Sequence, residues 1–170
     1  LLQAMGKLEE ARPLLEEALY AKRETLGDRH HLTLISIYRM GKLLQNMGQL
    51  EEARPLLEED LQASRETLGD RHPDTLTSIN NMGLLLMDMG QLEEAQALYE
   101  EALQGRKETL GDRHPKTLET IGNMVDLLRT TGSLDEAELI LGNTVVVAQE
   151  TLGSDHCLLY TSPSPRDEVL

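Results

Sequence analysis

Histidine, aspartate and arginine recur together in this chain, and such side chains could bind a metal ion or transfer protons. The segment ETLGDRHP occupies residues 66–73 and 108–115, and ETLGDRHH occupies residues 24–31. The imidazoles are spaced 42 positions apart, at His30, His72, His114 and His156. A metal site needs several ligands within about 2 Å of one ion, whereas equivalent residues of stacked repeats stay apart. We therefore predict a structural joint rather than a catalytic or metal-binding loop.

The same period of 42 residues extends to residues that pack rather than react. It relates two sets of small residues, Gly6, Gly48, Gly90 and Gly132, and Ala11, Ala53, Ala95 and Ala137. A fixed period of this length indicates an array of one supersecondary unit. The 170-residue chain has four Tyr and no Phe or Trp, so Leu and Met must fill its core. Such a composition favours helices over sandwiches or barrels.

The most regular copy, residues 73–111, divides into two helical patterns. One face of the first helix carries residues at three- and four-residue steps: Leu76, Ile79, Met82, Gly83 and Leu86. The apolar stripe of the second helix comprises Leu92, Ala95, Leu98, Tyr99, Ala102 and Leu103. An acidic ridge lies on its other side, with Glu93, Glu94, Glu100 and Glu101 after Glu51, Glu52, Glu58 and Glu59 of the copy before. We expect this ridge to be a solvated face, and a basic partner is the alternative.

The segment LGDRHP falls between the second helix of one copy and the first helix of the next. Gly111 predicts a left-handed C-cap, and Pro73 fits the first helical position because its missing N–H would have no partner there. The histidine falls at the N-cap, and the Asp and Arg of the motif are expected in solvent.

The net charge of the chain disfavours some classes of binding partner. Sixteen basic and thirty acidic residues give a net charge of −14, which disfavours nucleic acid and anionic membranes. No apolar run approaches the roughly 20 residues that span a bilayer. The single cysteine, Cys157, excludes a disulfide framework and favours a reducing compartment, so we predict a cytoplasmic location.

The segment INNMGLLL at residues 79–86, followed by Ala95 and Tyr99, resembles the pattern of the tetratricopeptide repeat (TPR) family. Twelve positions separate Gly83 from Ala95, as they separate Gly41 from Ala53. Small residues at these places let the two helices of one unit approach closely. The resemblance implies an all-α fold, a TPR-type superhelix built as a right-handed solenoid of antiparallel helix pairs.

The length of the unit indicates which branch of the family the chain resembles. Most TPR units have about 34 residues, and this one has 42, with the surplus in a longer second helix and the LGDRHP connector. Together with GQLEEARPLLEEDL at residues 48–61 and HPDTLTSINNMG at 72–83, that length resembles the kinesin light chain and nephrocystin-type branch of the family. The resemblance covers residues 1–156.

The period also predicts where units begin and end. It gives a partial unit at 1–28, units at 29–69 and 70–111, a degenerate unit at 112–153 and a tail at 154–170. We expect the chain to open inside a helix of an earlier unit and thus to be a fragment. The stretch CLLYTSPSPRD at 157–167 resembles the translation of a transposase adapter used in preparing sequencing libraries, so we expect an artefact there. A disordered Ser/Pro-rich tail is the alternative.

The family resemblance implies a peptide-binding concave wall formed by the first helix of each unit. The positions implied are Ile35, Tyr38, Arg39, Lys42 and Gln45; Thr77, Asn80, Asn81, Leu84 and Met87; and Glu119, Asn123, Asp126 and Arg129. Asn can donate to and accept from a peptide backbone, and Met adapts to varied apolar side chains. Simple solvation of the Asn residues is the alternative. The family's clamp for a terminal carboxylate is not expected, because Tyr38, Leu84 and Glu119 stand where it would want polar or basic groups.

One position departs from the pattern in a way that costs energy. Asp60 stands where the neighbouring copies have Ala18 and Ala102. Burying an unpaired carboxylate costs several kcal/mol, roughly. We predict that Asp60 lies at the rim or is paired, and that replacing it with Ala raises the melting temperature.

Two functional hypotheses remain. The first is a non-catalytic scaffold that binds a peptide segment of another protein, as a motor cargo adaptor within a cytoskeletal complex if the kinesin light chain resemblance extends to function. The second is a sensor or regulatory array of a larger signalling NTPase whose catalytic domain lies outside this sequence. The chain has no Gly-rich phosphate loop, metal-ligand spacing or nucleophile with its base, so we predict no enzymatic activity and no cofactor. Self-stacking through uncapped ends is a further expectation.

Overall fold

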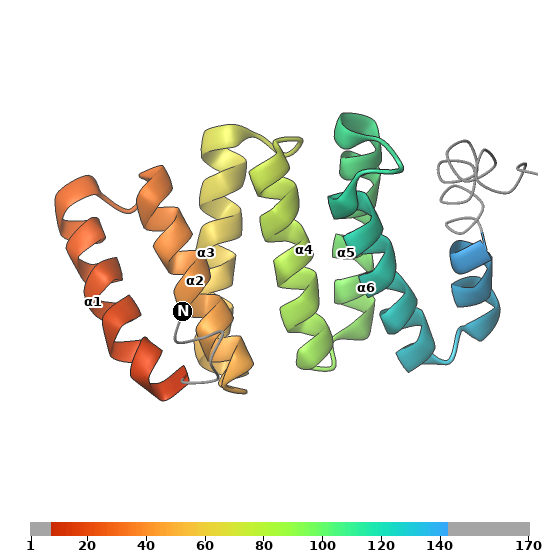
Figure 1. The fold of residues 1–170 in the computed structure, drawn as a ribbon, viewed down its shortest axis with the longest axis horizontal. Coiled ribbons are helices and arrows are strands. Elements are labelled where there is room, and N and C mark those ends of the chain that lie inside the picture. Colours follow the sequence, from red (N-terminus) through yellow and green to blue (C-terminus); the bar gives the residue numbers. More distant parts are fainter. Residues whose placement is uncertain (1–7, 143–170) are drawn as a thin grey trace, which may run out of the picture.

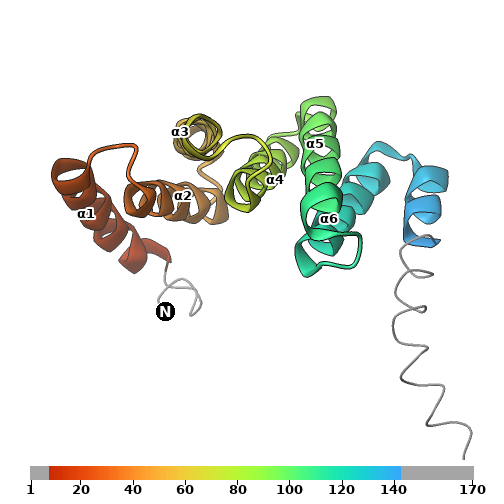
Figure 2. The ribbon, with the colours of Figure 1, turned by 90° about the horizontal axis from the view of Figure 1, so that it is seen from above.

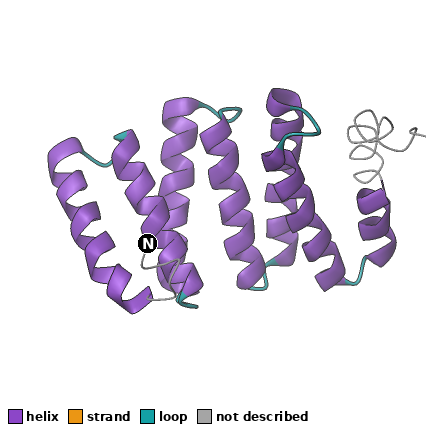
Figure 3. Ribbon diagram, viewed as in Figure 1, coloured by secondary structure: helices purple, strands orange, loops and turns teal. Residues whose placement is uncertain are grey.

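The computed structural model describes residues 8–142, and this range contains helices and short turns but no strand (Figures 1 and 3). Six helices have both ends in the range: α1 (Leu8–Leu26), α2 (His31–Asn46), α3 (Leu50–Leu68), α4 (Pro73–Asp88), α5 (Leu92–Leu110) and α6 (Pro115–Thr131). Another helix begins at residue 134 and reaches residue 142. The all-α prediction is confirmed. His156, the tail at 154–170 and the suspected artefact at 157–167 lie outside the described range.

Each helix packs against the next one along the chain, so the array grows along a line (Figure 1). Figure 2 shows α3 and α5 on one side of the array and α2, α4 and α6 on the other. We call the surface carried by α2, α4 and α6 the first-helix face. One continuous apolar core runs between the two rows, from Met40 and Leu43 through Met82 and Leu85 to Leu127.

The recurring histidines begin the first helices. His30, His72 and His114 are N-caps, and Nδ1 of each accepts a hydrogen bond from the backbone N–H two residues later at 3.2, 3.1 and 3.1 Å. This bond satisfies one of the free N–H groups at a helix start. Pro73 and Pro115 follow at the first helical position. The predicted joint is therefore confirmed, and its imidazoles serve as helix caps.

Gly111, like Gly69 one period earlier, does not have the expected cap geometry. It has φ +89° and ψ 163°, so the prediction of a left-handed cap was wrong in ψ, which is extended. Its carbonyl accepts from Thr117 Oγ1 at 2.8 Å, which ties the connector to the start of α6. The expected left-handed geometry occurs instead at Gly132, with φ 82° and ψ 8°.

Within each helix pair, glycine permits close contact at the positions that the sequence indicated. A Cβ built on Gly41 would lie 2.8 Å from Leu57 Cδ2, and one built on Gly83 would lie 2.8 Å from Tyr99 Cε1. Both distances are shorter than van der Waals contact. A side chain at Gly41 or Gly83 would therefore require Leu57 or Tyr99 to shift, which supports the small-residue register.

Successive second helices are joined by ion pairs that the sequence analysis assigned to solvent. The first set is Arg12–Glu52 at 3.1 Å, Arg23–Glu59 at 2.6 Å and Arg65–Glu101 at 2.7 Å. The Arg of the LGDRHP motif adds Arg29–Glu66 at 2.9 Å and Arg71–Glu108 at 3.3 Å. We call these five pairs the second-helix ladder. The acidic ridge is therefore not simply solvated, because part of it is neutralised by the neighbouring copy.

Candidate functional site

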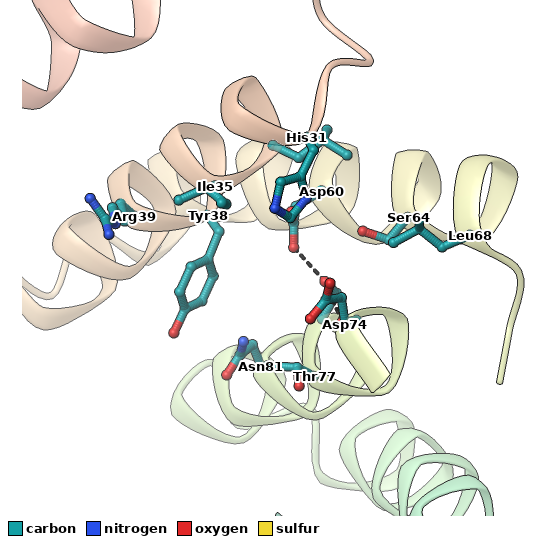
Figure 4. Close-up of a pocket in the computed structure, with 12 residues that line it drawn as sticks. His31, Ile35, Tyr38, Arg39, Asp60, Ser64, Leu68, Asp74, Thr77 and Asn81 are labelled. Atoms are coloured by element: carbon teal, nitrogen blue, oxygen red, sulfur yellow. Dashed lines mark hydrogen bonds between the residues drawn. The ribbon is translucent and has the colours of Figure 1, made fainter. Parts of the chain in front are cut away.

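A groove opens on the first-helix face where α2, α3 and α4 meet (Figure 4). Its cavity measures about 460 Å³. Helices α2 and α4 form its walls and α3 its floor, and the lining consists of His31, Leu34, Ile35, Tyr38, Arg39, Asp60, Ser64, Leu68, Asp74, Thr77, Ser78 and Asn81. A space of this size accommodates one or two large side chains of a ligand, not a whole folded element.

The walls combine an aromatic ring with an amide. Tyr38 on α2 extends toward Asn81 on α4 across the groove (Figure 4). Burial raises the pKa of Tyr38, the charges of Asp60 and Glu119 raise it further, and the side-chain amide of Asn81 beside the hydroxyl opposes the shift. Asn81 is only 7% exposed, and its Nδ2 makes no hydrogen bond of good geometry in the described structure. The groove wall thus holds a buried amide next to the Tyr38 hydroxyl whose N–H groups are not fully satisfied.

The floor carries a buried carboxylate. Asp60 is 5% exposed, and its Oδ2 accepts a hydrogen bond from Ser78 Oγ at 2.6 Å, drawn as a dashed line in Figure 4. Burial raises the pKa of Asp60 to about 6; the Ser78 bond opposes this shift, whereas Asp74 and Glu59 reinforce it. Asp60 thus does not lie at the rim, as one form of the prediction had it, and it is held by a hydrogen bond. Its partner is a neutral hydroxyl and not a cation.

We call the place where a second helix packs against the following first helix a junction. The other two junctions differ from the α3/α4 junction in the side chain at the position of Ser64. At the position of Ser64, the copy before has Lys22, whose Nζ donates to Ser36 Oγ at 2.7 Å. The copy after has Arg106, whose Nη1 donates to Thr120 Oγ1 at 2.5 Å and to the Lys116 carbonyl at 2.6 Å. In both copies a long basic side chain reaches from the second helix to the next first helix, half-buried at Lys22 and fully buried at Arg106. The short Ser64 leaves the middle junction open.

Comparison with known proteins assigns the chain to a family. The tetratricopeptide repeat model matches residues 1–59, 35–86 and 74–142. The chain belongs to the tetratricopeptide repeat family. A search of curated proteins found no match.

Solved structures agree with the TPR assignment. Two crystal structures of kinesin light chain-like proteins from Podosopora anserina with nearly identical TPR-like repeats share 29% identity with the chain, at TM-scores of 0.81 and 0.80. The matches cover 89% and 88% of this chain and 71% of each of those chains. BtubC (BKLC) from P. vanneervenii is similar in fold, with a TM-score of 0.77 at 18% identity over 99% of this chain and 65% of that one. The TPR fold expected from the sequence is thus confirmed, and similar solved structures are of the kinesin light chain-like kind that the sequence resembles.

The groove brings together five of the positions implied by the family resemblance. Ile35, Tyr38, Arg39, Thr77 and Asn81 all line it. They come from α2 and α4, the first helices of two consecutive TPR units.

Two implied positions lie between first helices instead of facing a ligand. Asn80 is 1% exposed, and its Oδ1 accepts from Asn123 Nδ2 at 3.1 Å. Gln45 is also buried, and its Nε2 donates to Asp88 Oδ2 at 2.5 Å. Neither peptide contact nor solvation accounts for Asn80. It joins α4 to α6 because the next TPR unit packs over it.

The remaining implied positions do not line the groove. Lys42 Nζ donates to Gln45 Oε1 at 3.2 Å, and Leu84 and Met87 pack partly against the core. Farther along the face, Glu119, Asp126 and Arg129 are exposed on α6.

Sequence reasoning missed the floor of the groove. Asp60, Ser64 and Leu68 come from the second helix α3, whereas the family resemblance pointed only to first helices. A signal was present, because Asp60 and Ser64 both depart from their equivalents one period away. The departure at Asp60 replaces an apolar side chain with a carboxylate, and the one at Ser64 replaces a long basic side chain with a short one.

Other kinds of site find no support within residues 8–142. That range has no group of three or more His, Cys, Asp or Glu arranged to hold a metal ion. It also has no helix that is both long and apolar enough to cross a bilayer.

Proposed function

We propose that this chain is a protein-interaction scaffold that binds an extended peptide segment of another protein in the groove between α2 and α4. Membership of the TPR family supports the role of interaction scaffold, since TPR proteins typically mediate protein–protein contact and are typically non-catalytic. The proposal that the peptide binds in this groove depends on one observation. The groove is open, about 460 Å³ in volume, and has the incompletely satisfied Asn81 Nδ2 in its wall.

The chemistry of the groove suits a peptide more than a small apolar ligand. The α2 wall offers apolar surface from Leu34, Ile35 and Tyr38, and the α4 wall offers hydrogen-bonding groups from Thr77 and Asn81. An extended peptide presents both kinds of group, because its backbone N–H and C=O groups stand between its side chains. Backbone acceptors could satisfy Asn81, while side chains enter the cavity.

The cellular setting is part of the proposal. The likeness to kinesin light chain-like TPR repeats favours a cargo adaptor of a microtubule motor in the cytoplasm. The net charge of −14 favours protein partners over nucleic acid or anionic membranes. Self-stacking through the ends of the array stays a prediction.

A randomised peptide library displayed on phage tests the proposal directly. We expect the full chain to select peptides, and we expect Tyr38→Ala combined with Asn81→Ala to weaken their binding about tenfold or more. Gln104→Ala on the exposed side of α5 serves as the matched control and should bind as the wild type does. Failure to select any peptide, or equal binding by the groove variant, would refute the groove as the site.

A further inference from the structure

Three equivalent junctions of the array differ in one respect that points to a specific ligand group. At two of them a basic side chain of the chain itself bonds to the next first helix, Lys22 at one, where it is half-buried, and Arg106 at the other, where it is fully buried. The junction between them has Ser64 at that position and the carboxylate of Asp60 one turn away on α3. We propose that the pocket over Asp60 receives a basic side chain, arginine or lysine, from the bound peptide.

The size of the pocket follows from the substitution at residue 64. At the closed junction, Arg106 extends from α5 toward α6 and is 1% exposed. It donates to Thr120 Oγ1 and the Lys116 carbonyl, with Thr77 Oγ1 at 3.4 Å. The equivalents of Thr120 and Lys116 in the open junction are Ser78 and Asp74, 42 positions earlier. The acceptors that would hold a guanidinium are therefore present, while the guanidinium is replaced by a cavity.

The charge of the pocket has the complementary sign. The two closed junctions place Ala18 and Ala102 at the position where the open one places Asp60. Within the described structure, Asp60 has one hydrogen bond, from Ser78, and no ion pair. A buried carboxylate without a counter-cation gains more from an incoming cation than an exposed one does, because little water screens the pair. The ring of Tyr38 adds a face that attracts cations.

Two basic residues, Arg39 and His31, also line the pocket. Arg39 is exposed and points away from Asp60 along α2 (Figure 4), so its guanidinium does not occupy the space above the carboxylate. His31 lines the N-terminal end of the groove. Asp74 on α4 and Glu59 on α3 add negative potential at Asp60. The field at the floor is thus set by carboxylates.

This inference rests on the proposed peptide groove, and its test separates the two. The probe is N-acetyl-arginine N-methylamide, titrated into the full isotope-labelled chain and followed by amide NMR. Its citrulline counterpart has nearly the same shape but no charge. We expect the arginine probe to shift the signals of Tyr38, Ser78 and Asn81 and to bind about tenfold or more tightly than the citrulline probe.

Two amide variants provide the matched comparison. Asp60→Asn should remove the preference for arginine over citrulline. Asp126→Asn removes an equal charge from the same face, outside the groove, and should retain the preference. Equal binding of both probes by the wild type, shifts confined to other surfaces, or a preference unchanged by Asp60→Asn would each overturn the proposal.

A third variant fills the pocket from within. Ser64→Arg restores the basic side chain found at the other junctions, so we expect it to fold and to lose the arginine-probe shifts at Ser78. Retained shifts would count against the pocket. The peptide library separates the two proposals: selected peptides that bind the groove without enriched Arg or Lys would support the scaffold and overturn this inference. A library without groove binders would defeat both.

Discussion

The α3/α4 and α5/α6 junctions are built on the same backbone but bury opposite charges. At α5/α6, Arg106 is held by a hydroxyl and a backbone carbonyl, and the junction is closed. At α3/α4, Asp60 is held by Ser78, and a cavity remains beside it. A repeat can therefore become specialised through changes at two positions of one helix, because the surrounding α-hairpins keep their packing.

Burial acts on both charges in the same direction, toward the neutral form. It lowers the pKa of Arg106, with Glu119 opposing the shift, and it raises the pKa of Asp60 to about 6. A guanidinium remains charged at any physiological pH, so Arg106 depends on its hydrogen bonds. Asp60 can instead become neutral near its shifted pKa. One junction is therefore insensitive to mild acid, and the other is not.

Removing the cation from the closed junction should have the largest effect. Arg106→Met keeps much of the apolar stem but leaves the Lys116 carbonyl and Thr120 without their charged donor. We expect a loss of about 2–4 kcal/mol in the free energy of unfolding, measured by urea denaturation. Lys107→Met, which removes an exposed charge from the next residue, should cost much less. Equal losses in the two variants would mean that Arg106 is not a structural closure.

Removing the carboxylate of Asp60 from the open junction should instead stabilise the fold. The folded-state pKa of Asp60, about 6, lies above the ordinary value of 3.8, so the native state binds more protons than the unfolded state between these values. Its stability therefore falls as pH rises through that window. We expect Asp60→Ala to be more stable than the wild type by roughly 2 kcal/mol near neutral pH, and by little near pH 4.

Thermal unfolding at the two pH values measures this difference. A gain of that size corresponds to about 4–8 °C for a chain of this length. Asp126→Asn removes an exposed carboxylate from α6 and should show no such pH-dependent gain. A clear fall in the melting temperature of Asp60→Ala near neutral pH would show that the carboxylate stabilises the fold through interactions beyond Ser78.

Much of this fold could be predicted from the sequence, because its signals are local or recur at one period. Helix faces, the His N-caps and the close approach at Gly83 all follow from spacing within one or two helices. The groove could not be predicted in the same way. The role of Ser64 depends on what α4 places opposite it, and the burial of Asn80 depends on α6. The ψ of Gly111 likewise depends on where the connector must lead the chain.

The hydroxyl of Ser78 offers a smaller change at the open junction. Ser78→Ala removes the one hydrogen bond to Asp60 and should cost about 1 kcal/mol near neutral pH. In the Asp60→Ala background the same change should cost almost nothing, because no carboxylate remains to be satisfied. A double-mutant cycle measured by urea denaturation gives the coupling. If the effects of the two substitutions on the free energy of unfolding simply add, the two side chains do not interact in solution.

The smallest effect is expected in the second-helix ladder, on the side of the array away from the groove. Glu101→Gln removes the carboxylate that pairs with Arg65 at 2.7 Å, and both side chains are more than a third exposed. Water and salt screen such a pair, so we expect a loss of about 0.5 kcal/mol that shrinks further in high salt. Glu100→Gln, one residue earlier on the exposed side of α5, is the control. A loss comparable to that of Arg106→Met would mean that the ladder, and not the junction floor, holds consecutive units together.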